Sequence, residues 1–377
     1  MMRTVSRLFL LAALLTLSLT RADAQVVSLD PGYSASVLTG GLSAPSNGLI
    51  YRRPTDDLLV VERSGNRVTR VDVTTGAKNT FATVSSPSYM AINSTGDVYV
   101  NPGDLGSSVS RFSSTGTFLG SFLAAGFPEG IAFDSADNFY VADNITGNIY
   151  KYAAGAFVSP SVFAGGFSAY LGMAISPVGR VFIGEFNRAS FFEVTPGGTT
   201  ISSHILWAGG IAQPSNIAFD PISGSVFVTT GSSVLRLLSP GVATTFATGF
   251  TSNVDLDFDA HGNLYVDDSE TGQIWKFTKV FDVCIQDESN GNLLQINSST
   301  GDYQFTNCGG LTLGGSGSII KRGGTITLQH YAADRVVLAK VDTAVNKATA
   351  SLRFLPTGMT FTITDRNTTN NTCGCAF

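Results

Sequence analysis

The stretch Asp137-Asn138-Phe139-Tyr140-Val141-Ala142-Asp143, followed by Asn148-Ile149-Tyr150-Lys151-Tyr152, decides the fold of this 377-residue chain. Two short runs rich in β-branched and aromatic residues flank a polar turn, which is typical of paired β-strands. The phrase recurs as Gly262-Asn263-Leu264-Tyr265-Val266-Asp267-Asp268 and Gln273-Ile274-Trp275-Lys276-Phe277. Weaker copies complete six hydrophobic anchors, which are Val60, Val100, Val141, Ile183, Val228 and Val266. Their spacings of 40, 41, 42, 45 and 38 residues predict an all-β chain with a six-bladed β-propeller.

Each repeat also contains a short apolar run with a small residue at its centre. Four of these runs are Met90-Ala91-Ile92, Ile131-Ala132-Phe133, Met173-Ala174-Ile175 and Ile217-Ala218-Phe219. The alanine predicts an innermost strand, where strands crowd around the axis. The segment Ser34–Thr39 has no repeat of its own, so we expect it to add the outer strand of the last blade, beside 253–277. That pairing would close the ring and remove two exposed sheet edges.

The chain divides into three predicted parts: a signal peptide over residues 1–24, a propeller over 25–280 and an all-β domain over 281–377. The first part has basic residues at Arg3 and Arg7, an apolar run at 8–19 and a small-x-small cleavage site at 22–24. The apolar run is shorter than the roughly 20 residues that a spanning helix needs. The sequence therefore predicts a secreted, periplasmic or extracellular protein with no membrane span in its mature chain.

From about Phe281 the 40-residue period disappears, and strand-like runs of five to eight residues follow one another. This spacing predicts a small β-sandwich or barrel. All four cysteines, Cys284, Cys308, Cys373 and Cys375, lie in this part. An even number in an exported chain predicts two disulfides, with Cys373 and Cys375 each reaching back to one of the other two and the pairing left open. Gly309-Gly310 and Gly314-Gly315-Ser316-Gly317 are predicted to be loops.

Composition limits the classes of partner. Charged residues make up 14% of the chain and the net charge is −5, which gives no basic field for nucleic acid. A hydrophobic share of 43% excludes a disordered chain. No Ser-His-Asp, Gly-x-Ser-x-Gly, His-Glu-x-x-His or Walker pattern occurs. We expect a monomer whose partner is an unidentified protein, glycan or small-molecule ligand.

The propeller phrases, which combine Ile-Ala-Phe-Asp, Gly-Asn-Leu-Tyr-Val-x-Asp and an Ile-x-Lys-Phe strand, resemble NHL repeats over roughly residues 33–280. They are also similar to the wider six-bladed group with the gluconolactonases and the streptogramin lyases. The resemblance to the lyases implies histidine general bases near the propeller mouth. This propeller has only His204, expected in an outer strand, and His261, expected in a turn. The C-terminal phrases, among them Cys284-Ile285-Gln286-Asp287 and the final Cys-Gly-Cys, resemble a module of secreted bacterial proteins.

The resemblance to gluconolactonases implies one divalent cation, such as calcium, held over the channel by Glu, Asp and Asn side chains. The matching polar residues at the starts of inner strands are Asn47, Glu129, Asn216 and Asp255. Carboxylate and amide oxygens suit a hard cation that polarises a lactone carbonyl. However, Asn216 and Asp255 come one position later than Asn47 and Glu129, and a one-residue shift reverses the face of a strand. These residues form either a metal site or the polar lining of a wet channel, and no other cofactor is expected.

Two groups of acids depart from simple packing. Asp257 occupies the position where other repeats have alanine, which is costly unless the acid is paired, binds a cation or is satisfied by backbone or water. Glu62, Asp143, Glu185 and Asp268 follow the anchors by two residues. We expect this second group to accept backbone N–H bonds in the next turn.

Two functions follow from these observations. The main hypothesis is a non-catalytic, secreted or surface-associated binding module. The alternative is a divalent-metal-dependent lactonase or esterase-like hydrolase with Glu129, Asp255 and Asp257 as the catalytic candidates.

Overall fold

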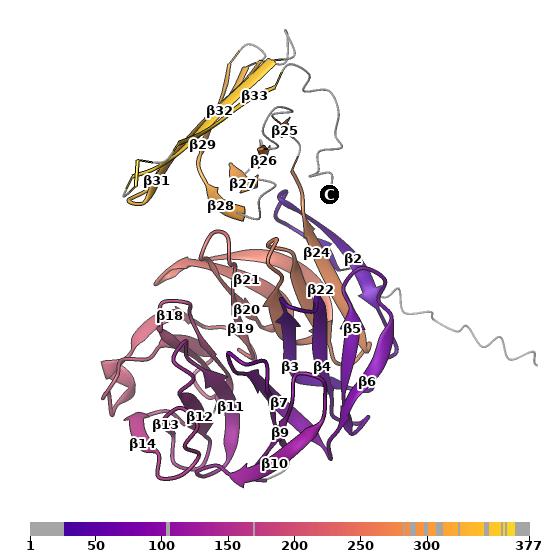
Figure 1. The fold of residues 1–377 in the computed structure, drawn as a ribbon. Helices are drawn as coiled ribbons and strands as arrows, with labels where there is room; N and C mark the ends of the chain where they lie inside the picture. Colours follow the sequence, from indigo (N-terminus) through magenta and orange to yellow (C-terminus); the bar gives the residue numbers. More distant parts are fainter. Residues whose placement is uncertain are drawn as a thin grey trace, which may run out of the picture.

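The computed structural model describes residues 26–102, 106–168, 170–281, 283–286, 292–297, 301–306, 312–322, 325–342, 347–355, 357–358 and 360–365. Within these ranges the regular elements are β-strands, apart from one 3-10 turn, η1 (Ile201–Ser203) (Figure 1). No helix in the described part could cross a membrane. The predicted signal peptide, residues 1–24, lies outside the described residues, and the predicted export stays a prediction.

Between Pro45 and Gly209, four separate sheets each contain four consecutive antiparallel strands. Their strands are β3 (Pro45–Arg52), β4 (Asp57–Glu62), β5 (Arg67–Asp72), β6 (Lys78–Thr83); β7 (Pro87–Ile92), β8 (Val98–Pro102), β9 (Ser108–Phe112), β10 (Phe118–Leu123); β11 (Pro128–Phe133), β12 (Phe139–Asp143), β13 (Asn148–Tyr152), β14 (Ser161–Ala164); and β15 (Tyr170–Ile175), β16 (Val181–Glu185), β17 (Ser190–Glu193), β18 (Ile205–Gly209). The first four predicted anchors all lie in the second strand of their sheets. The repeat of short strands is thereby confirmed.

A fifth, eight-stranded sheet joins the remaining repeats to the N-terminal strands. Its members are β19 (Ile217–Phe219), β20 (Val226–Thr229), β21 (Gly231–Ser239), β22 (Val242–Phe258), β23 (Leu264–Asp268), β24 (Gln273–Lys279), β2 (Tyr33–Thr39) and β1 (Val27–Ser28). The long strand β22 pairs with β21 through its first half and with β23 through its second half. Strand β2 pairs with β24, from Tyr33 opposite Lys279 to Thr39 opposite Ile274, as predicted.

The inner strands form a closed ring around a central channel. Strands β3, β7, β11, β15, β19 and β22 contact one another in this order, and β22 contacts β3 again. Aromatic side chains fill the space between neighbouring sheets: Tyr99 of β8 lies with its ring centroid 4.8 Å from that of Phe133 of β11. The arrangement is a β-propeller (Figure 1).

The strand register confirms the column of small residues on the inner strands. Ala91, Ala132, Ala174 and Ala218 lie opposite Tyr99, Tyr140, Phe182 and Phe227 of the next strands. Asp257 lies opposite Tyr265 in the same way and therefore occupies the alanine position. Ile50, opposite Leu59, is a second departure in this column.

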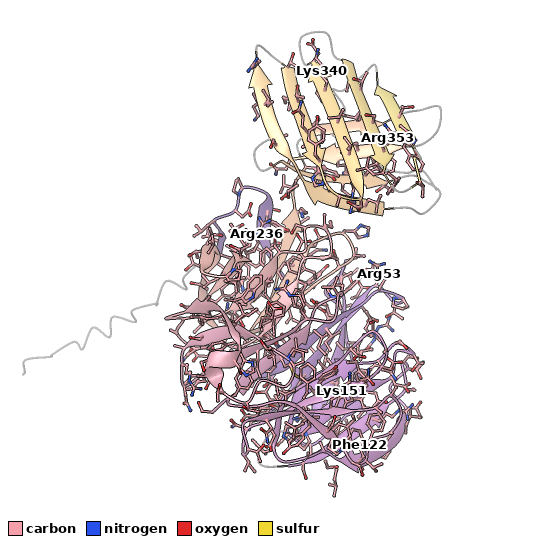
Figure 2. All side chains as sticks on the ribbon, turned by 90° about the vertical axis from the view of Figure 1, so that its left-hand side faces the viewer. Arg53, Phe122, Lys151, Arg236, Lys340 and Arg353 are labelled. Carbon is pink, nitrogen blue, oxygen red and sulfur yellow. The ribbon has the colours of Figure 1, made fainter. Side chains whose placement is uncertain are left out.

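The C-terminal region contains a four-stranded and a five-stranded antiparallel sheet. Their strands are β25 (Val283–Gln286), β26 (Leu293–Ile296), β27 (Asp302–Thr306), β28 (Thr312–Ser316); and β29 (Ser318–Arg322), β30 (Thr325–Tyr331), β31 (Arg335–Asp342), β32 (Lys347–Phe354), β33 (Thr360–Asp365). Phe305, Leu328 and Leu352 are buried in one hydrophobic core to which both sheets contribute. Lys340 and Arg353 are exposed on the five-stranded sheet (Figure 2). Two sheets over one core form a sandwich.

One predicted loop of this region is wrong. Gly314 and Gly315 lie in β28 and pair with Gln304 and Tyr303 of β27. A Cβ at Gly315 would lie 2.7 Å from the Tyr303 hydroxyl oxygen, and a Cβ at Gly314 would overlap Ile222. These glycines are therefore required by close neighbours in a strand and not by a turn.

The predicted disulfides cannot be assigned from the described part of the chain. The backbone of Cys284 lies in β25, but its side chain and the residues Cys308, Cys373 and Cys375 lie outside the described residues. The two disulfides stay a prediction.

Candidate active site at the mouth of the central channel

The inner strands line a cavity of about 230 Å³ along the propeller axis. Apolar side chains, mainly methionine, isoleucine and alanine from β7, β11 and β15, make much of its wall. The polar lining side chains are Asn216 of β19 and Asp255 and Asp257 of β22. The acidic side of the channel therefore lies where the last repeats meet the first.

Asp255 is held by hydrogen bonds from three directions. Its Oδ2 accepts the Leu49 N–H at 2.6 Å, and its Oδ1 accepts the Leu256 N–H at 2.7 Å and the Asn216 Nδ2–H at 2.5 Å. Only 3% of its surface is exposed. Burial, followed by the nearby charge of Asp267, raises the pKa of Asp255 well above its ordinary value. The three N–H donors offset part of this cost by hydrogen-bonding both carboxylate oxygens.

Asp257 faces the channel two residues farther along β22. Its Oδ2 accepts the Tyr51 N–H and its Oδ1 accepts the Phe258 N–H, both at 2.8 Å. Burial raises the pKa of Asp257 to about 7. The backbone thus satisfies both oxygens, which explains how an acid is tolerated in the alanine column.

Glu129 occupies a β-bulge at the start of β11. Pro128 and Gly130 pair with successive residues of β12, so Glu129 between them has no partner in the ladder. A bulge re-aims the side chain of its extra residue. The half-buried Glu129 carboxylate is hydrogen-bonded by the Asn144 side chain, and desolvation raises its pKa to about 7. A carboxyl group with this pKa can accept and return a proton at neutral pH.

Tyr89 of β7 is a buried hydroxyl donor beside these acids. The Asn47 side chain hydrogen-bonds the Tyr89 hydroxyl, and the charges of Glu129 and Asp255 act on it. Burial is the larger cause, and the Glu129 charge the second, of a pKa raised far above the ordinary value of a tyrosine. The hydroxyl therefore stays protonated and can donate a hydrogen bond to an oxygen that gains negative charge.

The predicted metal ligands were Asn47, Glu129, Asn216 and Asp255. Asn216 turns its Nδ2 toward Asp255, because its Oδ1 accepts the Ile217 N–H at 2.9 Å. The Asn47 Oδ1 accepts the Ser215 hydroxyl at 3.0 Å. Within the described residues, no group of three or more His, Cys, Asp or Glu side chains could hold a metal ion. In this arrangement the Asn47 and Asn216 amides are engaged in hydrogen bonds with neighbouring residues. The metal assignment stays a prediction.

The one-residue offsets between these residues coincide with irregular strand register. The register of β3 shifts between Pro45 and Leu49, and that of β22 shifts between Asn253 and Leu256. These irregularities change which face the following side chains occupy. Asn47 bonds Ser215, the residue before Asn216, and Asn216 in turn bonds Asp255.

Sequence reasoning missed three polar residues that follow the anchors by one position: Asn101, Thr229 and Asp267. Each accepts a backbone N–H from the start of the inner strand beside it. Asp267 is fully buried, its Oδ2 has no hydrogen-bond partner in the described part, and burial raises its pKa. The remaining residues of this column are Val61, Ala142 and Gly184. The sequence signal for these three residues was a polar side chain at a repeat position that is small or apolar in the other copies.

The acids two positions after the anchors have a structural role, but mostly toward the preceding loop and not the next turn as expected. Glu62 accepts the Ser43 N–H at 2.6 Å, Asp143 the Phe127 N–H at 2.7 Å and Asp268 the Thr251 N–H at 2.8 Å. Ser43 and Phe127 precede the inner strands β3 and β11, whereas Thr251 lies within β22, before the part that pairs with β23. Asp143 and Asp268 also accept the Ile145 and Thr271 N–H groups in the following turns, as predicted.

Neither propeller histidine lies in the channel lining. His204 follows η1 directly and precedes β18, which corrects its expected place within a strand. Its Nδ1 accepts the Thr195 N–H and its Nε2 lies 2.9 Å from the Gly165 carbonyl oxygen. His261 lies in a turn, as expected. A lyase mechanism with histidine bases at this mouth has no support from these positions.

Comparison with known proteins identifies the fold and no family. No family model and no curated protein matches the sequence. Among solved structures, a gluconolactonase from Xanthomonas campestris is 12% identical, with a TM-score of 0.56 over 66% of this chain and 90% of that one. A PQQ-bound aldose sugar dehydrogenase from Streptomyces coelicolor is 20% identical, with a TM-score of 0.52 over 67% of this chain and 97% of that one. A virginiamycin B lyase from Staphylococcus aureus is 10% identical, with a TM-score of 0.50 over 66% of this chain and 100% of that one. At these identities the likeness shows a gluconolactonase-like β-propeller fold alone.

Proposed function

We propose that this protein hydrolyses lactones or related small esters at the mouth of the propeller channel. The observation that carries the proposal is the juxtaposition of Glu129, a bulged carboxyl group able to exchange a proton near pH 7, with Tyr89, a hydroxyl that stays protonated. A general base beside a hydrogen-bond donor is what acyl transfer to water requires. A carboxyl group with a strongly raised pKa beside a polar donor is a typical feature of an active site.

The fold relatives support an enzyme over a non-catalytic binding module. Their descriptions include a gluconolactonase, a sugar dehydrogenase and a lyase, all built on the same kind of propeller. The histidine positions do not suit the lyase. The carboxyl groups at the channel mouth are better suited to the hydrolysis of a lactone.

The reaction follows from the roles of three groups. Glu129 takes a proton from water as the water oxygen bonds to the lactone carbonyl carbon. Tyr89 donates a hydrogen bond to the carbonyl oxygen, which becomes an oxyanion in the tetrahedral intermediate. The ester C–O bond then breaks, and the leaving alkoxide takes the proton from Glu129. The product is an open hydroxy acid, and Glu129 is again ionised. Asp255 shapes the mouth through its bonds to Leu49 and Asn216.

Three finer features belong to the same proposal. We infer six blades, because the inner strands contact one another in a closed order that matches the six anchors. The apolar run and cleavage site at residues 1–24 support export. The late cysteines support a disulfide-linked C-terminal domain.

The test is to measure the turnover of a panel of γ- and δ-lactones by the purified protein, with acid release as the readout. We expect Glu129→Gln to lower kcat by at least ~10²-fold, since a positioned base contributes about that much. Glu270→Gln removes an exposed carboxylate at the β23–β24 turn and serves as the matched control. Absence of turnover by the unmodified protein, or full activity of Glu129→Gln, would show that the hydrolase proposal is wrong.

A further inference from the structure

Asn101 lies between the two residues on which the proposed chemistry depends. Its side chain is 0% exposed. Its Oδ1 accepts the Tyr89 N–H at 3.0 Å, and its Nδ2 donates to the Pro128 carbonyl oxygen at 2.6 Å. Pro128 directly precedes Glu129. One amide on β8 is therefore bonded to the inner strand of its own sheet and to the inner strand of the next.

The backbone at both bonded points is irregular. The register of β7 shifts between Pro87 and Tyr89, and that of β11 shifts between Pro128 and Gly130. At a bulge the ladder no longer holds every peptide group, so another group must fix the backbone. Asn101 supplies bonds at both bulges, and its geometry sets where the two following side chains leave their strands.

Thr229 shows that this column links neighbouring inner strands elsewhere in the ring. Its Oγ1 accepts the Asn216 N–H at 2.9 Å and donates to the Val254 carbonyl oxygen at 3.2 Å. Asp267 accepts the Val254 and Asp255 N–H groups through Oδ1. The positions Val61, Ala142 and Gly184 have no side-chain polar group to do so. The link between β7 and β11 therefore depends on the residue Asn101 and is not a general property of this column.

We infer that Asn101 is a positioning residue for Glu129 and Tyr89, which it holds in register with each other across two sheets. The inference rests on the proposed function, because it assigns Asn101 to that same site. A displacement of a catalytic group by about 1 Å can cost about 10²-fold in rate. Loss of the bridge should therefore lower kcat and leave KM within about threefold, since no substrate contact is removed.

The experiment compares Asn101→Leu with His204→Phe. His204 also bridges two backbone groups from a buried position, Gly165 after β14 and Thr195 after β17, but away from the channel lining. Phenylalanine there keeps the stack on Phe167 and removes both hydrogen bonds. We expect similar losses of melting temperature in the two variants and a fall of kcat by about 10²-fold in Asn101→Leu alone. Asn101→Thr introduces the same hydroxyl that Thr229 uses to accept and donate, and it should restore most of kcat.

The outcomes separate the inference from the proposed function. Equal falls of kcat in Asn101→Leu and His204→Phe would show a merely structural role and overturn the inference. A normal kcat in Asn101→Leu, together with an inactive Glu129→Gln, would also overturn the inference. The hydrolase proposal would stand in that case. An inactive unmodified protein, or an active Glu129→Gln, would overturn both. If Asn101→Leu does not fold, Asn101→Asp keeps the acceptor for Tyr89 and loses the donor to Pro128. It should lower kcat, and a normal value would refute the inference.

Discussion

Asp255 and Leu49 are 206 residues apart in sequence, yet the Asp255 carboxylate accepts the Leu49 N–H at 2.6 Å. Strands β22 and β3 belong to different sheets, so this bond joins the last repeat to the first by a side chain and not by a ladder. Asp257 forms a second bond of this kind with the Tyr51 N–H. The acids of the channel thus hold the seam of the ring as well as lining it.

The first prediction concerns the Asp255 bond. Asp255→Asn leaves one oxygen for three N–H donors, so an amide N–H must face another donor. We expect the free energy of unfolding to fall by about 1–3 kcal/mol, the cost of leaving a buried polar group unsatisfied. Denaturant unfolding measures it, with the exposed Glu270→Gln as a control expected within ~0.5 kcal/mol of the unmodified protein. An unchanged midpoint for Asp255→Asn would contradict the role of the bond.

The second prediction is a fall of stability with rising pH. The pKa values of Glu129 and Asp257 are both raised to about 7, so the folded protein holds protons that the unfolded chain releases above about pH 4. This stabilisation is fully present below the unfolded pKa and is lost as the pH rises through 7. The melting temperature should therefore drop by about a few degrees between pH 4 and pH 8.

Asp257→Asn supplies the control for this pH dependence, because its amide does not titrate. Its melting temperature should vary less over the same interval. A scanning calorimetry series in buffers of equal ionic strength decides the matter. A slope as steep as that of the unmodified protein would mean that Asp257 ionises in the folded state without cost.

The third prediction concerns calcium. The Asn216 amide directs its Nδ2, and not its oxygen, at Asp255. We therefore expect calcium in excess over EDTA to leave the melting temperature unchanged, whereas occupancy at 100 times Kd would stabilise by about 2.7 kcal/mol. A rise that Asp255→Asn abolishes would instead establish the cation site implied by the resemblance to gluconolactonases.

The fourth prediction concerns the Tyr89 hydroxyl. Tyr89→Phe should lower kcat on lactones by about 10²-fold, the usual cost of losing one donor to an oxyanion. Tyr152→Phe removes another buried tyrosine hydroxyl, which accepts the Ala125 N–H, and should keep its activity. Steady-state kinetics of the pair, with melting temperatures, separate a chemical role from a packing role. Equal kcat values in the two variants would remove Tyr89 from the mechanism.

The architecture was predictable because it depends on features that repeat. Anchors such as Val141 and alanines such as Ala132 recur at fixed positions, and each copy reinforces the others. The pairing of β2 with β24 followed from a strand without a repeat of its own. Asp257 was identified as a departure from the alanine column, and the register confirms that position.

The geometry of the site was less predictable, because it depends on irregular backbone. The bulge at Glu129 and the shift before Leu256 change the facing of side chains in ways that strand alternation does not reveal. Asn101 acts through a neighbouring sheet, and only the folded ring shows which carbonyl oxygen lies within its reach. The glycines of β28 resemble a turn in the sequence, and only the structure shows that Gly315 is packed against Tyr303 and Gly314 against Ile222.

The unbroken strand β22 has a consequence for how the protein tolerates change. It passes from one sheet position to the next over 17 residues without a loop. A residue inserted at a surface turn is absorbed locally, whereas one inserted within β22 would displace Asp255 and Asp257 relative to Leu49 and Tyr51. Length variation and engineered insertions should therefore be accepted between other repeats and rejected at this junction.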